Sequence, residues 1–115
     1  KKKGKIIIEV PSSNDILLSK FNLQKFKDFT FCIESLLWHN EETLTKFLKK
    51  AGFRKININF IQRYDLNNHF GWLLKEKPGG HEFFKSLFNN RQRALYDRFL
   101  KEKKLTDTII AIAEK

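Results

Sequence analysis

The sequence predicts an α/β fold, with a small mixed sheet of three strands and helices that flank it. Two runs rich in isoleucine, at residues 5–10 and 54–61, predict two strands, and a β-branched run at 107–113 predicts a third. Apolar residues at helical spacing occur between these runs. With 115 residues, twelve of them Phe, the chain has apolar surface enough for a core and is expected to form one domain or part of one.

The first strand is predicted from the run Lys5–Val10, which is ended by Pro11 and a cluster of turn formers. A continuous apolar run of this kind is typical of a strand buried on both faces, as in parallel sheets. The polar loop at 12–15 would then lie at the carboxyl end of the strand, where open α/β sheets bind ligands. Residues 14–38 lack a clean period, and we expect them to form short helical turns and a covering loop.

The helix that begins near residue 41 is predicted from a cap, an apolar face and a stop. Asn40 is a good N-cap, and Glu41 and Glu42 favour the positive end of the helix dipole. Gly52 ends the helix. The predicted apolar face has the spacing i, i+3, i+4 and i+7 and comprises Leu44, Phe47, Leu48 and Ala51.

The remaining elements follow from alternation and turn signals. Ile56, Ile58 and Phe60 alternate with Asn, which predicts a half-buried strand near a sheet edge. From residue 81 to 104 the pattern is helical, with a break at Asn89-Asn90. The apolar stripe of this region is predicted to contain Phe84, Leu87, Phe88, Arg91, Leu95 and Phe99. A final strand is predicted from about residue 107 to 113.

Several motifs follow one another in a recognisable order. The first group comprises Ile7–Pro11, Glu34, Trp38-His39-Asn40, Glu42-Thr43-Leu44 and Lys50-Ala51-Gly52-Phe53. The second group comprises Gln62-Arg63-Tyr64, Asn67-Asn68-His69, Trp72-Leu73, Lys77-Pro78-Gly79-Gly80-His81 and Asp107–Ala111. In this order and spacing the chain resembles the C-terminal portion of a class I, Rossmann-like, S-adenosylmethionine-dependent methyltransferase. The resemblance implies that the last strand is antiparallel and lies between the other two, and that residues 65–104 are a helical insertion.

The resemblance implies an enzyme that works as part of a longer chain, of which residues 1–115 are the acceptor side. The cofactor, S-adenosylmethionine, would be held mainly by an amino-terminal half, because this sequence has no glycine-rich turn after a first strand and no acid after a second. Gly79 and Gly80 follow a proline and do not replace that turn. This chain alone is therefore expected to be inactive. Its methyl acceptor is expected to be a small molecule or a sugar nucleotide, which would carry a phosphate group.

The resemblance also assigns an acceptor site. His39 is the candidate catalytic base, since imidazole titrates near neutral pH. The candidate substrate-binding residues follow the first strand, precede the helix at 41 or follow the second strand, and they are Ser13, Asn14, Asp15, Trp38, Arg63, Tyr64, Asn68, His69 and Trp72. The dispersed His residues and the lone cysteine do not have the spacing of a zinc site, so no metal is predicted.

Each of these assignments has a structural alternative. His39 lies beside Asn40 and could help to cap the helix, and His69 could lie in a surface turn. Arg63 could grip a phosphate or carboxylate with its planar fork, or could pair with an acid of the chain. The two Trp residues, Trp38 and Trp72, could stack on a ligand or pack in the core.

The charge of the chain, +10 with a pI near 9.8, favours anionic partners but also fits a solvated lysine-rich surface. A basic patch is predicted on the last helix, at Arg91, Arg93, Arg98, Lys101, Lys103 and Lys104. The alternative function is therefore a small basic module that binds nucleic acid or protein without catalysis. A non-catalytic interaction domain descended from a methyltransferase is a third reading. The resemblance favours a small molecule over nucleic acid.

Composition gives expectations about context. The chain lacks Met, which predicts a segment of a longer protein, and an uncovered half-sheet predicts a dimer. The lone Cys32 makes no intrachain disulfide, so a reducing, cytoplasmic location is expected, and its apolar neighbours predict a packing role. No apolar run reaches the roughly 18 residues of a membrane span, so no membrane partner is predicted.

Overall fold

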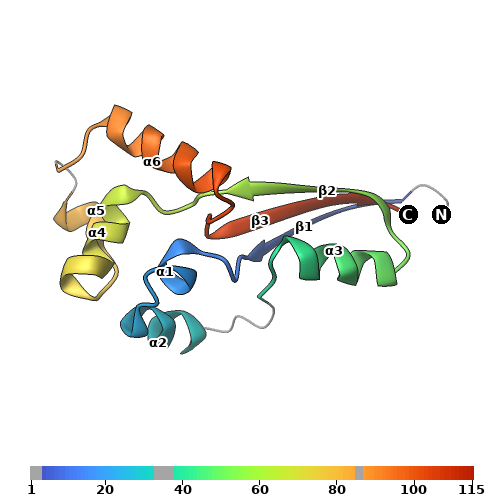
Figure 1. The fold of residues 1–115 in the computed structure, drawn as a ribbon, viewed down its shortest axis with the longest axis horizontal. Coiled ribbons are helices and arrows are strands. Elements are labelled where there is room, and N and C mark those ends of the chain that lie inside the picture. Colours follow the sequence, from blue (N-terminus) through green and yellow to red (C-terminus); the bar gives the residue numbers. More distant parts are fainter. Residues whose placement is uncertain (1–3, 33–37, 85–86) are drawn as a thin grey trace.

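The computed structural model describes residues 4–32, 38–84 and 87–115 of the chain (Figure 1). Glu34 and the side chain of Cys32 lie outside this description. The elements, in chain order, are β1 (Lys5–Pro11), α1 (Ile16–Ser19), α2 (Gln24–Cys32), α3 (Glu41–Lys50), β2 (Arg54–Ile61), α4 (Leu66–Lys75), α5 (Gly80–Phe83), α6 (Asn90–Glu102) and β3 (Thr108–Glu114). The three predicted strands and the helix after Asn40 are thus present.

The sheet has the strand order β1-β3-β2, and β3 is antiparallel to both neighbours. Ala111 marks the register, since it pairs with Ile8 on one side and with Ile58 on the other. β1 and β2 therefore run in the same direction, and their carboxyl ends lie at the same end of the sheet (Figure 1). The position predicted for the last strand, between the other two, is confirmed, and so is the edge position of β2.

One core fills the space between the sheet and α3, which lies along one face of the sheet (Figure 1). Leu44 and Leu48 of α3 are buried against the central strand β3. Burying a leucine stabilises the fold by about 1.5–3 kcal/mol, so these two contacts largely hold the helix in place. The predicted apolar face of α3 is too wide, because the Phe47 side chain is 51% exposed and Ala51 is also exposed.

The other face of the sheet has no cover within the described residues. Alternate residues of β1 are exposed, and Ile7 on this face is 70% exposed. Ile112 and Asn57 lie beside it in the register. The prediction that β1 is buried on both faces is therefore wrong for this chain. α3 covers one face of the sheet, and the other described helices pack beyond its end.

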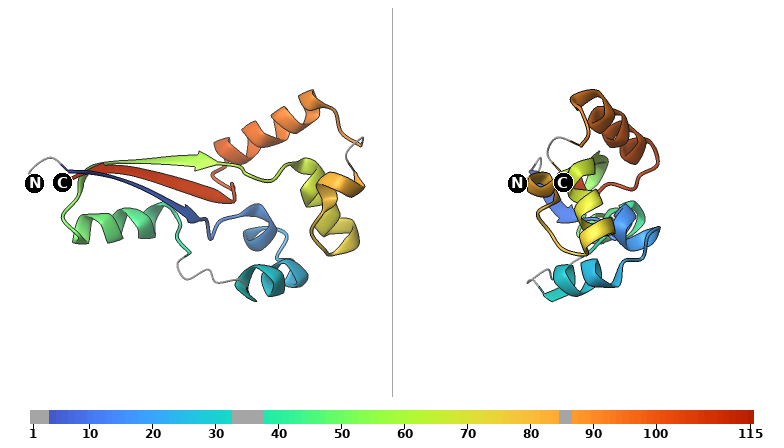
Figure 2. Two further views of the ribbon diagram at one scale, coloured as in Figure 1. Left: turned by 180° about the vertical axis from the view of Figure 1, so that it is seen from behind. Right: turned by 90° about the vertical axis from the view of Figure 1, so that its left-hand side faces the viewer.

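A second core joins the helices beyond the carboxyl ends of β1 and β2 (Figures 1 and 2). Its buried members are Ile16 and Leu17 of α1, Trp72 of α4 and Leu100 of α6. The predicted helix break is confirmed, since the Asn89 side chain accepts a hydrogen bond from Gln92 N at 2.8 Å and begins α6.

The predicted stripe on α6 is on the wrong face. Leu95 and Phe99 are 51% and 43% exposed, whereas Leu100 is fully buried and Tyr96 packs beside it. The period was correct, but α6 carries apolar residues on two faces, and the one that includes Tyr96 and Leu100 meets the other helices.

Two glycines allow α4 and α5 to pack backbone against backbone. A Cβ on Gly80 would lie 2.2 Å from the carbonyl oxygen of Asn67, and one on Gly71 would lie 2.6 Å from the Cα of Gly80. Neither position has room for a side chain. The turn between the two helices uses Gly79 at φ +98°, a conformation that favours glycine. The residues between β2 and β3 thus form a tightly joined pair, α4 and α5, followed by α6. Among the described helices, none has the length and apolar character needed to cross a membrane.

Candidate functional site at the carboxyl ends of β1 and β2

A pocket of about 400 Å³ lies where β1 and β2 end and β3 begins. Its volume is within the range of small-molecule sites. Its lining comes from the sheet, from α2 and α4 and from the loops between them, and comprises Glu9, Pro11, Asp15, Phe26, Phe29, Thr30, Trp38, Arg63, Tyr64, Asn68, Trp72, Pro78, Gly79, His81, Asp107 and Thr108. This is the end of the sheet at which the sequence predicts a ligand.

The structure brings together six of the predicted substrate-binding residues. These six line the pocket and are Asp15, Trp38, Arg63, Tyr64, Asn68 and Trp72. Ser13, Asn14, His39 and His69 are not among the lining residues. The roles of all ten residues remain predictions, but the pocket gives six of them a common surface.

The loop after β1 places one buried carboxyl at the pocket. Asp15 is 3% exposed, and its side chain accepts a hydrogen bond from Leu17 N at 2.9 Å, which caps α1. Burial raises the pKa of Asp15 to about 7, because a charged carboxylate loses hydration there; the Leu17 bond opposes this shift and the charge of Asp107 adds to it. Within the described residues, the Asp15 carboxyl has this one hydrogen bond. It is therefore a pocket carboxyl with capacity to accept another donor.

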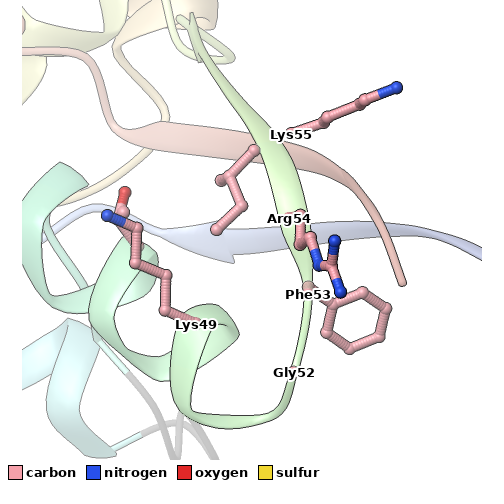
Figure 3. A pocket seen from close by; sticks show the side chains of 7 residues that line it. Lys49, Gly52, Phe53, Arg54 and Lys55 are labelled. Atoms are coloured by element: carbon pink, nitrogen blue, oxygen red, sulfur yellow. The ribbon is translucent and has the colours of Figure 1, made fainter.

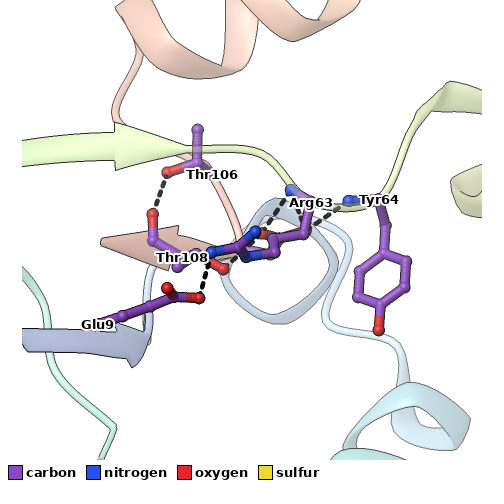
Figure 4. Close-up of polar contacts among 6 residues, drawn as sticks. Glu9, Arg63, Tyr64, Thr106 and Thr108 are labelled. Atoms are coloured by element: carbon purple, nitrogen blue, oxygen red, sulfur yellow. Dashed lines mark hydrogen bonds and ion pairs between the residues drawn. The ribbon is translucent and has the colours of Figure 1, made fainter. Parts of the chain in front are cut away.

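The loop after β2 is held by a second, half-buried carboxyl, Asp107. Its oxygens accept hydrogen bonds from the backbone N–H groups of Arg63 and Tyr64, at 3.0 Å each (Figure 4). They also accept from Gln62 Nε2 at 2.9 Å. The Thr108 hydroxyl donates a further bond at 2.9 Å. Burial raises the pKa of Asp107, and the hydrogen bonds from Arg63, Thr108 and Tyr64 oppose the shift. Asp107 thus fixes the direction of the chain after β2.

The interaction between Gln62 and Asp107 is reciprocal. Gln62 Oε1 accepts a hydrogen bond from Asp107 N at 2.9 Å, while its Nε2 donates to the Asp107 carboxylate and to Tyr64 O. Sequence reasoning missed both residues as parts of the site. They are 45 positions apart, and the only signal in the sequence is a polar residue next to the end of each predicted strand.

Arg63 pairs with an acid of the chain, as its structural alternative predicts. Its NH2 group donates to Glu9 Oε2 across the mouth of the pocket (Figure 4). Both side chains are about half exposed, so the pair contributes little to stability. Asp65, which is close to Arg63 in the sequence, instead caps α4 by accepting from Asn68 N at 3.0 Å.

One wall of the pocket is aromatic. The rings of Phe26 and Trp72 meet edge to face, with centroids 5.0 Å apart and an interplanar angle of 84°. Phe29 lies 5.3 Å from Trp72. Trp72 is 3% exposed and belongs both to the helical core and to the pocket lining, so the two readings of this residue are compatible.

His39 lies at the start of α3. Its Nδ1 is 2.9 Å from Thr43 Oγ1, and its ring lies 5.9 Å from that of Phe47. Its backbone forms a parallel bridge with Ser12, in which Ser13 N donates to His39 O at 3.0 Å. The geometry matches the capping alternative. The catalytic role assigned to His39 remains a prediction that the pocket geometry does not favour.

His69 is buried in α4, so the interpretation as a surface turn is wrong. It is 2% exposed, and burial lowers its pKa to about 4, which the charge of Asp65 opposes. The ring is therefore neutral near pH 7. The Gln62 amide nitrogen lies 3.3 Å from Nε2, and the Tyr96 hydroxyl lies 2.6 Å from Nδ1. His69 supports the pocket from behind and does not line it.

A second hollow lies at the other end of β2, between its first residues and the end of α3 (Figure 3). Its charged lining residues are Lys49, Arg54 and Lys55, beside Gly52 and Phe53. Lys55 has φ +48°, at a register shift between Arg54 and Asn57. This groove is open and cationic, in contrast to the pocket at the other end of the strand.

The described residues do not form a cradle for S-adenosylmethionine. The turn after β1 consists of Ser12 and Ser13 and contains no glycine, and its backbone groups bond to Asp107 and His39. Gly79 and Gly80 serve the close approach of α5 to α4. This arrangement provides no surface on which the described backbone could surround the cofactor, so no chemical step is assigned to the cofactor here.

Among solved structures, the chain is similar to the crystal structure of a SAM dependent methyltransferase from Archaeoglobus fulgidus, with 19% sequence identity and a TM-score of 0.47. The match covers 100% of this chain and 46% of that chain, so this chain spans less than half the length of that protein. No family model and no curated protein matches the sequence. At this TM-score the likeness carries no argument about activity, ligand or site.

Proposed function

We propose that the chain is the acceptor side of an S-adenosylmethionine-dependent methyltransferase, and that the pocket at the carboxyl ends of β1 and β2 receives the methyl acceptor. The observation that supports this most is the position of the pocket. It lies at the end of the sheet where open α/β folds bind ligands, and it gathers residues from segments far apart in the sequence.

In this proposal Asp15, and not His39, is the group that accepts a proton from the methyl acceptor. A general base works best when its pKa lies near the operating pH, and burial brings the pKa of Asp15 to about 7. The base must also be within reach of the acceptor, and Asp15 lines the pocket. Trp72 and Phe29 provide the apolar wall, and Arg63 with Tyr64 forms the opposite rim.

The cofactor would be held by a preceding half of the protein. The test is calorimetry with S-adenosylmethionine on two proteins: the 115-residue chain, and the same chain extended by roughly 120 residues of its reading frame, the length of such a half. We expect binding by the extended protein alone. An extended protein that folds and does not bind the cofactor, or a frame that starts near Lys1, would refute the proposal.

The second candidate function is a basic binding module, which would use the cationic groove and the basic patch on α6. Three cations of the basic patch on α6 are engaged within the chain: Lys101 lies 2.9 Å from Asp97, Lys104 lies 2.9 Å from Glu41, and Arg93 lies 3.9 Å from Asp65. These pairs reduce the charge available to a polyanion. Binding of a DNA or RNA oligonucleotide that weakens steeply with added salt would favour the module.

A further inference from the structure

The charged groups that line the pocket are mostly acidic, whereas the chain as a whole is basic. The chain carries +10, yet the described lining holds three carboxyls, on Glu9, Asp15 and Asp107, beside one guanidinium, on Arg63, and one imidazole, on His81. Arg63 already binds Glu9, so its charge is neutralised within the chain. The charge of the whole surface therefore does not indicate what this pocket binds.

The three carboxyls are not equally available to a ligand. Asp107 accepts bonds from Gln62, Arg63, Tyr64 and Thr108, and Glu9 is paired with Arg63. Among the described residues, Asp15 accepts a single side-chain hydrogen bond, from Leu17 N. A ligand with a hydrogen-bond donor can therefore satisfy Asp15 without breaking any contact of the folded chain.

The aromatic wall favours the same kind of ligand. Phe26 and Phe29 pack on Trp72 at the back of the pocket, and Tyr64 at the rim is 60% exposed. Aromatic faces attract flat apolar groups and also cations, which interact with the negative face of the ring. An ammonium group also carries N–H donors, from which a buried carboxylate can accept hydrogen bonds.

An anionic ligand would be disfavoured by the same charged groups. To bind a phosphate group, Arg63 would have to leave Glu9, and the phosphate would then lie near the buried carboxyl of Asp15 and the half-buried carboxyl of Asp107. Both the lost pair and the like charges oppose such binding. The expectation of a phosphate-bearing acceptor is therefore not favoured by this lining.

We infer that the pocket selects a small, flat amine as its ligand, with the ammonium group on Asp15 and the ring against Trp72 and Phe29. The inference rests on the proposed function in one respect: it takes this ligand to be the methyl acceptor. The binding itself needs no cofactor and can be tested on the chain alone.

The test compares three probes that share a phenyl ring: 2-phenylethylamine, 3-phenylpropionate and phenyl phosphate. Each is titrated into the 115-residue chain at pH 8, and binding is followed by tryptophan fluorescence. We expect the amine to bind about tenfold more tightly than either anion, since one close charge pair is of that order. Equal affinities, tighter binding of an anion, or no binding of the amine would overturn the inference.

Asp15→Asn provides the decisive variant, because Asn keeps the capping acceptor for α1 and removes the charge. We expect the preference for the amine to fall to about twofold or less. Asp28→Asn is the matched control: Asp28 is exposed on α2, bonds to Gln24 and does not line the pocket, so its removal should leave the preference unchanged. Loss of preference in both variants, or in neither, would contradict a role for Asp15.

A pH titration of the wild-type chain tests the same contact without a substitution. Amine affinity should rise from pH 6 to pH 8 as Asp15 loses its proton, whereas the affinity of 3-phenylpropionate should not rise. A flat profile for the amine would overturn the inference. If the amine binds as expected but the extended protein does not bind S-adenosylmethionine, the proposed function fails and the ligand class stands.

Discussion

The two hollows at the ends of β2 have opposite characters. The pocket at its carboxyl end is lined by three carboxyls and an aromatic wall, and the loop after β2 is fixed by hydrogen bonds to Asp107. The groove at its first residues is lined by Lys49, Arg54 and Lys55 and is open to solvent. The difference shows that a net charge of +10 describes the outer surface of the chain and not its most enclosed site.

The two hollows also differ in how firmly the surrounding backbone is fixed. At the pocket, Asp107 and the glycine contacts of α4 and α5 specify the backbone, so substitutions there should change stability. At the groove, side chains extend into solvent from a strand end that contains a strained residue, Lys55. We therefore expect large effects from the pocket and small effects from the groove.

The largest effect is expected from Asp107→Ala. Removing the carboxylate leaves the N–H groups of Arg63 and Tyr64 and the Gln62 amide without their acceptor, which should lower the free energy of unfolding by about 3 kcal/mol. Urea denaturation measures the change. Asp97→Ala, which removes an exposed i,i+4 partner of Lys101, is the control and should cost no more than about 0.5 kcal/mol. Similar losses in both variants would contradict the anchoring role.

The next effect is expected from Gly80→Ala. The new Cβ would lie 2.2 Å from Asn67 O, so α4 and α5 must move apart, at a cost of about 2 kcal/mol. Gly4→Ala is the control, because a Cβ there meets nothing within 4 Å. Thermal unfolding should separate the two variants. A neutral Gly80→Ala would mean that the close approach of these helices does not define the pocket wall.

A pH-dependent effect is expected from Asp15. Its folded-state pKa, about 7, lies above the ordinary carboxyl value near 3.9, so the folded chain holds this proton more tightly and loses stability as pH rises between those values. Asp15→Asn should therefore become progressively more stable relative to the wild type from pH 4 to pH 7. Urea denaturation at several pH values tests this, and a constant difference would contradict the raised pKa.

His69 should act in the opposite direction within part of the same range. Its folded-state pKa, about 4, lies below the ordinary value near 6.5, so its contribution to stability grows as pH rises between them. The wild-type chain should show a shallow profile from pH 4 to pH 6.5, because His69 offsets the two carboxyls of raised pKa, Asp15 and Asp107. In Asp15→Asn the stability should rise more steeply with pH over this interval than in the wild-type chain, and an unchanged profile would contradict this offset.

The smallest effect is expected at the groove. Lys55 has φ +48°, and Lys55→Gly should relieve this conformation and stabilise the chain by about 0.5 kcal/mol. Lys46→Gly, on an exposed position of α3, is the control and should destabilise it by about 1 kcal/mol. Equal losses in the two variants would show that Lys55 is not strained.

The sequence predicted the elements better than their contacts. Local signals, such as the Asn40 cap and the alternation of β2, are set by neighbouring residues and were confirmed. The order of the three strands came from the resemblance, and it too was confirmed. The buried face of α6 was predicted wrongly, because two apolar faces compete on that helix and only packing decides between them.

The site shows the same limit. Asp15 and Arg63 were found because they directly follow predicted strands, where ligands bind in open α/β sheets. Glu9 and Asp107 were missed, since their importance depends on partners 54 and 44 residues away in the chain. Charge neutralisation and hydrogen bonding are properties of these pairs, and a single position in the sequence does not reveal them.

The most direct test of the contrast is an amide-shift titration of the ¹⁵N-labelled 115-residue chain with 2-phenylethylamine, followed by phenyl phosphate. The account predicts that the amine shifts the amides of residues 9–15, 62–68 and 107–108 and the indole of Trp72, and leaves residues 49–56 unchanged. Any shifts caused by phenyl phosphate should lie at residues 49–56. If the amine shifts the groove, or if both probes shift the pocket equally, the pocket does not select its ligand by charge and the account is wrong.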